Sequence, residues 1–290
     1  MDEAKICCYV VSGMHHGGDG AWNREGKRMS YSKITGNGDN TILTNSDGLR
    51  QGMAEVPVQG GTMSAYYAAP AVVERPPLIL VIQEIFGLHE HIKDVCRRLA
   101  HEGYMALGME LYQRQGDASQ YTDIAQLIQD IVSKVPDEQV LRDLDSGVKW
   151  AAAQGADVTQ LGVTGFCWGG RLTWLYAAHN PACKAAVAWY GKLVTGHSPT
   201  QKEHPIDVVD RLHAPVLGLY GGQDASIPLE DVHRMQAALA QGSEAARASR
   251  IEVYPDSGHA FYADYRPSYN PADARDAWAK AVEWFDRLLD

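Results

Sequence analysis

The sequence predicts an α/β fold with a mostly parallel central sheet and helices on both of its faces. Short apolar segments alternate along the chain with longer segments in which apolar residues recur every three or four positions. Strands that take turns with helices are typical of a parallel sheet, because each helix carries the chain back across one face. The chain has 290 residues, 45% of them hydrophobic, so it can bury a large core.

Six apolar segments are expected to form the strands of this sheet. They are residues 78–83 (LILVIQ), 104–109, 161–164, 185–190, 215–220 and 250–254. Five segments between or after them have the periodicity of amphipathic helices. These are residues 91–101, 140–153, 168–179, 229–240 and 272–289. We expect all of them to belong to one domain spanning residues 51–290, since open α/β sheets of this length are common.

The first 50 residues differ in composition from the rest. They carry eight of the 28 glycines, almost no periodic apolar pattern, and six basic and six acidic residues. We expect residues 1–50 to be a disordered extension or a stretch that precedes the true start of the protein. No metal site is predicted there, because the histidines and cysteines of this segment lack the spacing of zinc ligands. These residues are Cys7, Cys8, His15 and His16.

The charge and the cysteine content exclude several classes of protein. A formal charge of −10 with no basic stripe disfavours binding to nucleic acids or anionic membranes. The apolar segments are far shorter than the roughly 18 residues of a membrane span, and no secretory signal is evident. Five scattered cysteines do not form a disulfide framework and suit a reducing compartment. We expect a cytoplasmic monomer that acts on a small molecule.

Residues 161–170 (LGVTGFCWGG) place Cys167 at a turn between a predicted strand and a predicted helix. The pattern G-x-C-x-G corresponds to the G-x-S-x-G turn, in which a nucleophile occupies a strained backbone position between small residues. Gly165 and Gly169 supply the space. The sulfur would lie at the carboxyl edge of the sheet and at a helix N-terminus, which favours a thiolate. The alternative is a buried structural cysteine.

An acid and a histidine follow Cys167 in the order that nucleophilic acyl chemistry on this fold requires. Asp224 lies just after the strand at 215–220, and His259 lies just after the strand at 250–254. Separately, Asp224 reads as a turn residue and His259 as a loop histidine. Jointly, three such residues at three strand ends indicate a catalytic triad.

Five motifs, in order, resemble the dienelactone hydrolase family, also called carboxymethylenebutenolidases, from about residue 53 to the C-terminus. They are residues 83–87 (QEIFG), 110–115 (ELYQRQ), 165–170 (GFCWGG), 221–224 (GGQD) and 258–261 (GHAF). The resemblance implies an α/β-hydrolase fold with Cys167 as nucleophile, His259 as base and Asp224 as the group that orients the imidazole. It also implies that Glu84 lies against the cysteine. A carboxylate there would disfavour the thiolate or accept its proton, although Glu84 capping backbone amides is the alternative.

The same geometry indicates the oxyanion hole and part of the substrate site. The backbone amides of Trp168 and Ile85 are expected to hold the oxyanion. The resemblance implies that Arg114 binds a substrate carboxylate. The family's second carboxylate-binding arginine is replaced here by Ala263, with Arg266 three residues further on, so an anionic lactone should bind more weakly. Aromatic side chains expected near the substrate are Phe86, Tyr112 and Phe261.

These residues predict a hydrolase that cleaves a lactone or a small carboxylic ester through an acyl-enzyme on the cysteine. The chemistry requires no metal and no organic cofactor. Two alternatives stay open. One is a thioesterase, because acyl transfer is common to both reactions. The other is a non-catalytic scaffold that binds a small carbonyl metabolite.

Overall fold

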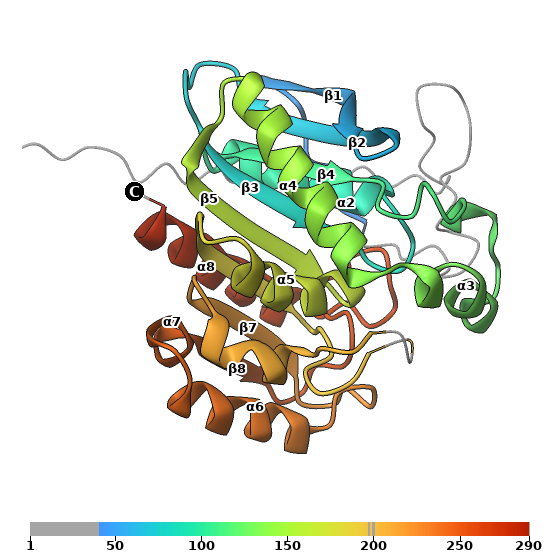
Figure 1. Cartoon of the computed structure of the whole chain (residues 1–290), viewed down its shortest axis with the longest axis vertical. Helices are drawn as coiled ribbons and strands as arrows, with labels where there is room; N and C mark the ends of the chain where they lie inside the picture. Colours follow the sequence, from blue (N-terminus) through green and yellow to red (C-terminus); the bar gives the residue numbers. More distant parts are fainter. Residues whose placement is uncertain (1–40, 197, 199–200, 290) are drawn as a thin grey trace, which may run out of the picture.

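The computed structural model describes residues 41–196, 198 and 201–289. Eight strands form one sheet in the order β1-β2-β4-β3-β5-β6-β7-β8 (Figure 1). Their bounds are β1 Leu49–Val58, β2 Gly61–Pro70, β3 Pro77–Ile82, β4 Met105–Met109, β5 Asp157–Phe166, β6 Cys183–Trp189, β7 Val216–Gly221 and β8 Arg250–Tyr254. The strands from β3 to β8 pair in parallel, whereas β1 and β2 are antiparallel to their neighbours.

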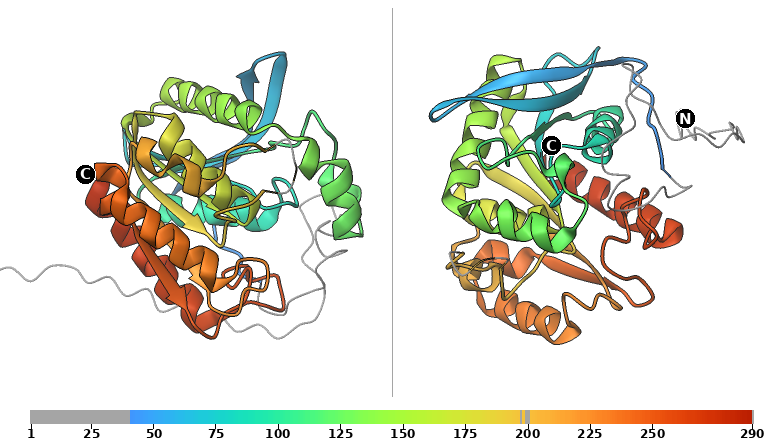
Figure 2. Two further views of the ribbon diagram at one scale, coloured as in Figure 1. Left: turned by 60° about the horizontal axis from the view of Figure 1, so that its bottom comes forward. Right: turned by 90° about the vertical axis from the view of Figure 1, so that its right-hand side faces the viewer.

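Helices cover both faces of the sheet, with α2 and α8 on one side and α4 and α5 on the other (Figure 2). The α-helices are α2 Glu90–His101, α3 Ile124–Asp130, α4 Asp137–Ala153, α5 Trp168–His179, α6 Leu229–Gln241, α7 Glu244–Ala248 and α8 Pro271–Leu288. Three short 3-10 helices are η1 Ala118–Gln120, η2 Val132–Lys134 and η3 Pro205–Arg211. The predicted α/β fold is confirmed, and each of the six predicted strands and five predicted helices is present within a few residues of its expected bounds.

The hairpin of β1 and β2 was not predicted. A two-residue turn joins the strands, with Gly60 at φ +89° and Val58 paired with Gly61. β1 is the edge strand and most of its residues are exposed or half-exposed. Because an exposed edge strand needs no continuous apolar face and tolerates Pro57, it gives only a weak sequence signal.

The chain just before β1 lies against α2. The Thr44 amide donates to Asp94 Oδ1 at 2.6 Å, and Arg97 Nε donates to the Thr44 carbonyl at 3.0 Å. β1 begins at Leu49, so residues 41–50 contribute to the described structure. The rest of the expected N-terminal extension, with Cys7, Cys8, His15 and His16, lies outside the described residues.

Four parallel strands end at the same edge of the sheet, and each is followed by one of the predicted site residues. Glu84 follows β3, Cys167 follows β5, Asp224 follows β7 and His259 follows β8. These four residues lie between 35 and 83 positions from the next one along the chain, and they come to one edge of the sheet because parallel strands place their carboxyl ends together.

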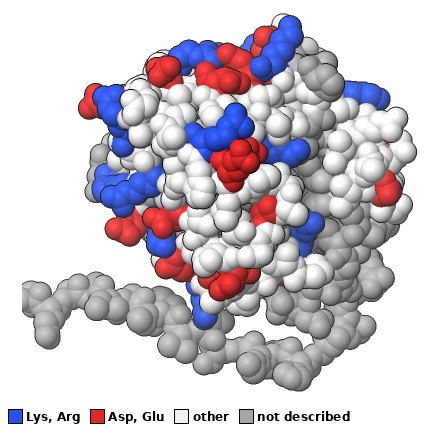
Figure 3. All heavy atoms as spheres, turned by 90° about the horizontal axis from the view of Figure 1, so that it is seen from below, with Lys and Arg blue, Asp and Glu red and all other residues white. Residues whose placement is uncertain are grey.

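The described surface mixes charges of both signs. On the face seen in Figure 3, Lys and Arg side chains are interspersed with Asp and Glu, and neither sign forms a large patch. Within the described residues, no helix has the length and apolar character that crossing a bilayer requires.

Candidate active site

Cys167 occupies a sharp turn between β5 and α5. Its backbone has φ 56° and ψ −111°, a conformation that non-glycine residues rarely adopt, and its amide donates to the Trp189 carbonyl at 3.0 Å. A methyl group on Gly165 would lie 2.4 Å from the Gly169 carbonyl oxygen, so no larger residue fits there. The two glycines thus allow the strand, the turn and the helix to pack closely around Cys167, which is a partly buried residue.

The structure brings the three expected catalytic side chains together. Cys167 Sγ lies 3.1 Å from His259 Nε2, and His259 Nδ1 lies 2.6 Å from Asp224 Oδ2. The second Asp224 oxygen accepts hydrogen bonds from the Ser226 amide at 2.9 Å and from its hydroxyl at 2.6 Å. Hydrogen bonds to both of its carboxylate oxygens therefore hold Asp224 in place. The imidazole lies between an acid and a thiol, as in acyl-transfer enzymes.

The charges of these groups support one another. Burial alone would lower the pKa of His259, but the negative charge at Cys167 and the hydrogen bond to Asp224 raise this pKa to about 10. Burial would raise the pKa of Asp224, but hydrogen bonds from His259 and Ser226 lower it. At neutral pH the imidazole is therefore protonated next to the Cys167 sulfur.

Two backbone amides are available where the oxyanion hole is expected. In the described part of the chain, neither the Ile85 amide nor the Trp168 amide donates to a protein acceptor. Glu110 holds the loop that carries Ile85, since its carboxylate accepts from the Leu88 amide at 2.8 Å and from the Tyr112 amide at 3.3 Å. A fixed loop with an unused amide suits the binding of a developing negative charge.

Glu84 is nearly inaccessible, with 1% of its surface exposed. Its Oε2 accepts a hydrogen bond from the Tyr265 hydroxyl and lies 3.4 Å from His89 Nε2. Burial would raise the pKa of Glu84, but the hydrogen bond and charge of His89, with smaller effects of His91 and Arg266, lower it to about 2. The carboxylate is thus an anion held by two ring side chains that the sequence did not single out.

Two of the residues expected to contact substrate have other roles in the structure. Arg114 forms a two-pronged ion pair with Asp143 of α4, at 2.5 and 3.0 Å, and also donates to the Gln59 carbonyl. Phe261 is fully buried and packs against the rings of Trp189, Tyr190 and Tyr254. Their expected part in substrate binding has no support in this geometry, because one is neutralised by a buried carboxylate and the other belongs to the core.

The other expected aromatic residues lie closer to the chemistry. Tyr112 packs edge-on against the Trp168 ring, with centroids 4.9 Å apart. Burial first, and then the charge at Cys167, hold the pKa of Tyr112 well above its usual value. Phe86 lies beneath the guanidinium of Arg266, whose Cζ is 5.8 Å from the ring centroid.

Arg266 is a site residue that sequence reasoning noticed but did not place. Burial would lower its pKa, but the charges of Glu84, Tyr265 and Cys167 raise it, so the guanidinium lies among the groups of the site. Its guanidinium forms no ion pair within the described part of the chain. Tight turns follow His259, where Ala260 has φ 61°.

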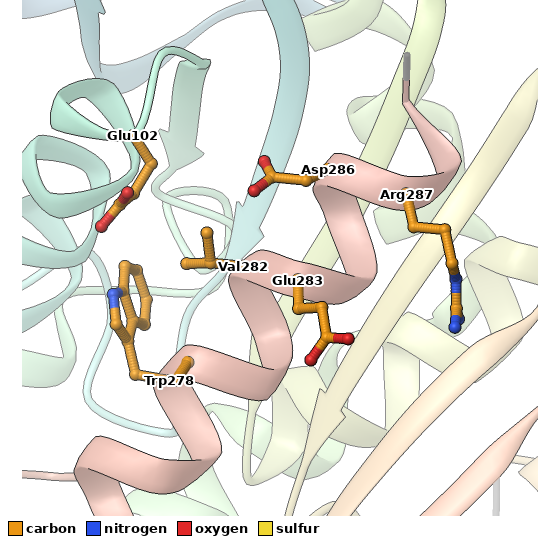
Figure 4. Close-up of a pocket in the computed structure, with 7 residues that line it drawn as sticks. Glu102, Trp278, Val282, Glu283, Asp286 and Arg287 are labelled. Carbon is orange, nitrogen blue, oxygen red and sulfur yellow. The ribbon is translucent and has the colours of Figure 1, made fainter. Parts of the chain in front are cut away.

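A separate open groove of about 700 Å³ lies between the end of α2 and α8. Figure 4 shows Glu102, Trp278, Val282 and Asp286 pointing toward it, whereas Arg287 points away along α8. It contains none of the residues expected for catalysis. Among the described residues, no cluster of three or more histidine, cysteine or acidic side chains has the arrangement of a metal site.

The sequence is similar to known proteins over most of its length. The sequence profile of the dienelactone hydrolase family matches residues 63–289. A Salmonella typhimurium protein named "Putative carboxymethylenebutenolidase" is 54% identical over 247 residues, which are 84% of this chain and 90% of that protein. A Bradyrhizobium protein named "Probable 2-oxo-3-(5-oxofuran-2-ylidene)propanoate lactonase" is 32% identical over 230 residues, which are 77% of this chain and 89% of that protein.

A solved structure gives the same result in three dimensions. The crystal structure titled as a "Putative Dienelactone Hydrolase" from Klebsiella pneumoniae superposes with a TM-score of 0.79 at 54% sequence identity. The match covers 82% of this chain and 99% of that chain.

Proposed function

The chain belongs to the dienelactone hydrolase family and is a hydrolase, and on that premise we propose that it cleaves a lactone or a small carboxylic ester through an acyl-enzyme on Cys167. The observation that carries the proposal is the continuous contact from Cys167 Sγ through His259 to Asp224, at 3.1 and 2.6 Å. An acid, an imidazole and a thiol in contact in this order activate the thiol for attack on a carbonyl carbon.

In the first half of the proposed reaction, the Cys167 sulfur attacks the carbonyl carbon and its electron pair forms the new C–S bond. The carbonyl oxygen becomes an oxyanion, which the amides of Ile85 and Trp168 bind. The C–O bond to the leaving oxygen then breaks as the oxyanion collapses, and the His259 imidazolium gives its proton to that oxygen. The product of this half is a thioester on the enzyme; from a lactone, the released hydroxyl stays attached to the acyl group.

In the second half, His259 is neutral and accepts a proton from water while the water oxygen attacks the thioester carbon. The same amides bind the second oxyanion, and its collapse breaks the C–S bond. This step returns the sulfur as a thiolate beside a protonated His259 and releases the carboxylic acid. Asp224 holds the imidazole in the orientation that serves both halves.

For the substrate we propose that Arg266, and not Arg114, contacts an anionic or strongly polar group of the ester. Arg266 lies near Glu84 and Cys167 in charge interactions, and its guanidinium covers the Phe86 ring. Arg114 is already paired with Asp143. One guanidinium that faces a nearby carboxylate binds an anion more weakly than two free ones, so neutral lactones and esters are also within the proposed substrate range.

Replacement of the nucleophile tests the proposal. Cys167→Ala should abolish turnover of p-nitrophenyl acetate and of a panel of lactones, because no sulfur remains to form the thioester. Cys183→Ala is the matched control, since Cys183 is a buried cysteine of β6 and its loss should leave turnover close to wild type. Intact mass after a rapid acid quench should show the acyl adduct only when Cys167 is present.

The same panel separates the alternatives. Faster turnover of acyl-thioesters than of the matched oxygen esters would favour a thioesterase. A Cys167→Ala enzyme as active as wild type would overturn the proposed mechanism, and failure of the wild-type protein to turn over any member, without an acyl adduct, would favour a binding scaffold.

A further inference from the structure

β1 is an edge strand whose outer side pairs with no other strand in the described part of the chain (Figure 1). Its ten residues pair with β2 in an unbroken antiparallel register. By contrast, the pairing of β3 with β5 and that of β5 with β6 contain register shifts. The backbone groups on the outer side of β1 therefore follow one another regularly, as they do in a strand inside a sheet.

The hydrogen bonds of β2 show which residues of β1 face outward. The Glu110 amide, just after β4, donates to the Ser64 carbonyl of β2 at 2.8 Å. This carbonyl points away from β1, so Glu55, which lies opposite Ser64, has its own amide and carbonyl on the outer side. Because the direction of hydrogen bonding alternates along a strand, Gln51, Met53 and Glu55 all face outward.

The features that normally block an exposed edge are sparse in β1. Edge strands are usually protected by lysines, prolines, bulges or a covering segment. β1 contains no lysine and no bulge, and Pro57, its one proline, lies close to the turn. The outward-facing amides of Gln51, Met53 and Glu55 donate to no acceptor among the described residues. Met53, at their centre, leaves 57% of its surface exposed.

The outward-facing residues are complementary to a second copy of the same strand. Two antiparallel β1 strands related by a twofold axis at Met53 place each Gln51 opposite Glu55 of the other copy. Gln51 Oε1 accepts from the Tyr66 hydroxyl, which leaves the side-chain NH2 group as a donor. Glu55 Oε1 accepts from the Ser64 hydroxyl at 2.8 Å, which leaves Oε2 as an acceptor. The two exposed Met53 side chains meet at the axis.

We propose that two copies of this chain associate through antiparallel pairing of their β1 strands, centred on Met53. With eight strands from each copy, the sheet continues across the interface as one sheet of sixteen strands. The sequence alone predicts a monomer, because the outer side of an edge strand has no sequence pattern of its own. One pair of strands buries less area than a standard interface, so we expect a Kd on the order of micromolar.

Sedimentation velocity of the full chain, from roughly 1 µM to roughly 1 mM, tests the proposal. The wild type should change from monomer to dimer as its concentration rises. Met53→Pro removes the two central hydrogen bonds of the interface and should abolish the dimer. The fold should tolerate it, because this amide makes no bond to β2. Met53→Ile is the matched control, since it keeps the amide and an apolar side chain, and its Kd should stay within about threefold of wild type.

Two substitutions at Gln51 test the register. Gln51→Glu should raise the Kd about tenfold, because it places like charges opposite each other at two symmetric positions. Gln51→Lys should lower the Kd by a similar factor, since each lysine then lies opposite Glu55 of the other copy. Circular dichroism checks that every variant is folded. The test therefore uses no activity, and its result is independent of the proposed function.

Three outcomes would overturn the inference. A chain that stays monomeric at every concentration leaves this edge to a different partner. A dimer whose Kd is the same in the wild type, Met53→Pro and Gln51→Glu associates through another surface. If Met53→Pro does not fold, the Gln51 variants decide, and changes of the Kd in the same direction in Gln51→Glu and Gln51→Lys contradict the proposed register.

Discussion

At the scale of single residues, the proposed contact of the Arg266 guanidinium with substrate can be tested through substrate preference. Arg266→Gln should raise KM for anionic lactones about tenfold relative to a neutral ester of similar size, because it removes one charge-assisted contact. The measurement is the ratio of kcat/KM for the two substrates. Arg114→Gln is the control and should leave the ratio unchanged, since Arg114 is paired with Asp143. Equal effects of the two substitutions on the ratio would contradict the assignment of Arg266.

The triad could be proposed from the sequence because each of its members follows a strand and carries a local signature. Cys167 has glycines on both sides, and Asp224 and His259 come in the required order. The partners of longer side chains depend on packing that no local pattern contains. Arg114 meets an acid 29 residues later on α4, and Arg266 reaches the site although its sequence position is shifted. Tyr265 and His89 had no signal beyond their closeness to Glu84 and His259.

At the scale of elements, the strand, turn and helix around the nucleophile pack at backbone contact. A methyl group on Gly169 would lie 2.5 Å from the carbonyl oxygens of Ile82 and Gln83 at the end of β3. Gly169→Ala should therefore lower the free energy of unfolding by at least about 2 kcal/mol, because backbone atoms cannot move aside as a side chain does. Urea denaturation measures this change.

Gly52→Ala is the matched control. Its added methyl group would meet nothing within 4 Å in β1, so stability should stay the same or rise by about 0.5 kcal/mol. Equal losses of unfolding free energy in Gly169→Ala and Gly52→Ala would show that the close backbone contact is not the reason why position 169 requires glycine.

The sequence predicted the buried elements better than the exposed ones. β3 and β7 are almost wholly buried, as is β5 from Leu161 onward, and these segments are apolar in sequence. The β1–β2 hairpin was missed because β1 faces solvent along most of its length. Short elements such as α7 and η3 were missed as well, since one or two turns carry too few residues to show a period.

At the scale of the whole molecule, a buried network of charges holds α2 to the two chain segments beside it. Arg98 bridges Asp94 and Asp264 at 2.7 and 2.5 Å, and Asp94 also accepts from the Thr44 amide. The segment before β1 and the segment after His259 therefore share one helix as a support. The net charge of −10 lies entirely after residue 50. It did not predict this network, because a net charge does not tell which acidic side chains are paired.

Asp264 is the member of this network through which acid should weaken the fold. Burial would raise its pKa, but His91 and Arg98 lower it below the value in the unfolded chain. Asp264 therefore contributes stability that is complete above its unfolded pKa of about 3.9 and is lost as pH falls through the lower folded value. Asp264→Asn should cost about 3 kcal/mol at pH 7, because it leaves Arg98 and His91 short of a buried partner. The cost should shrink as pH falls below about 4, because the unfolded wild-type chain then binds a proton at Asp264 that the folded protein binds only at lower pH.

Urea denaturation of both proteins at pH 7 and pH 3 measures this difference. Glu203→Gln is the control, since it breaks an ion pair with Arg211 in which both side chains are more than half exposed, and such pairs contribute about 1 kcal/mol or less. A cost of Asp264→Asn that is the same at both pH values would mean that the residue acts through packing and not through its charge. A pH-dependent cost, accompanied by loss of Cys167 reactivity, would show that the ion pair to α2 supports the segment that follows His259.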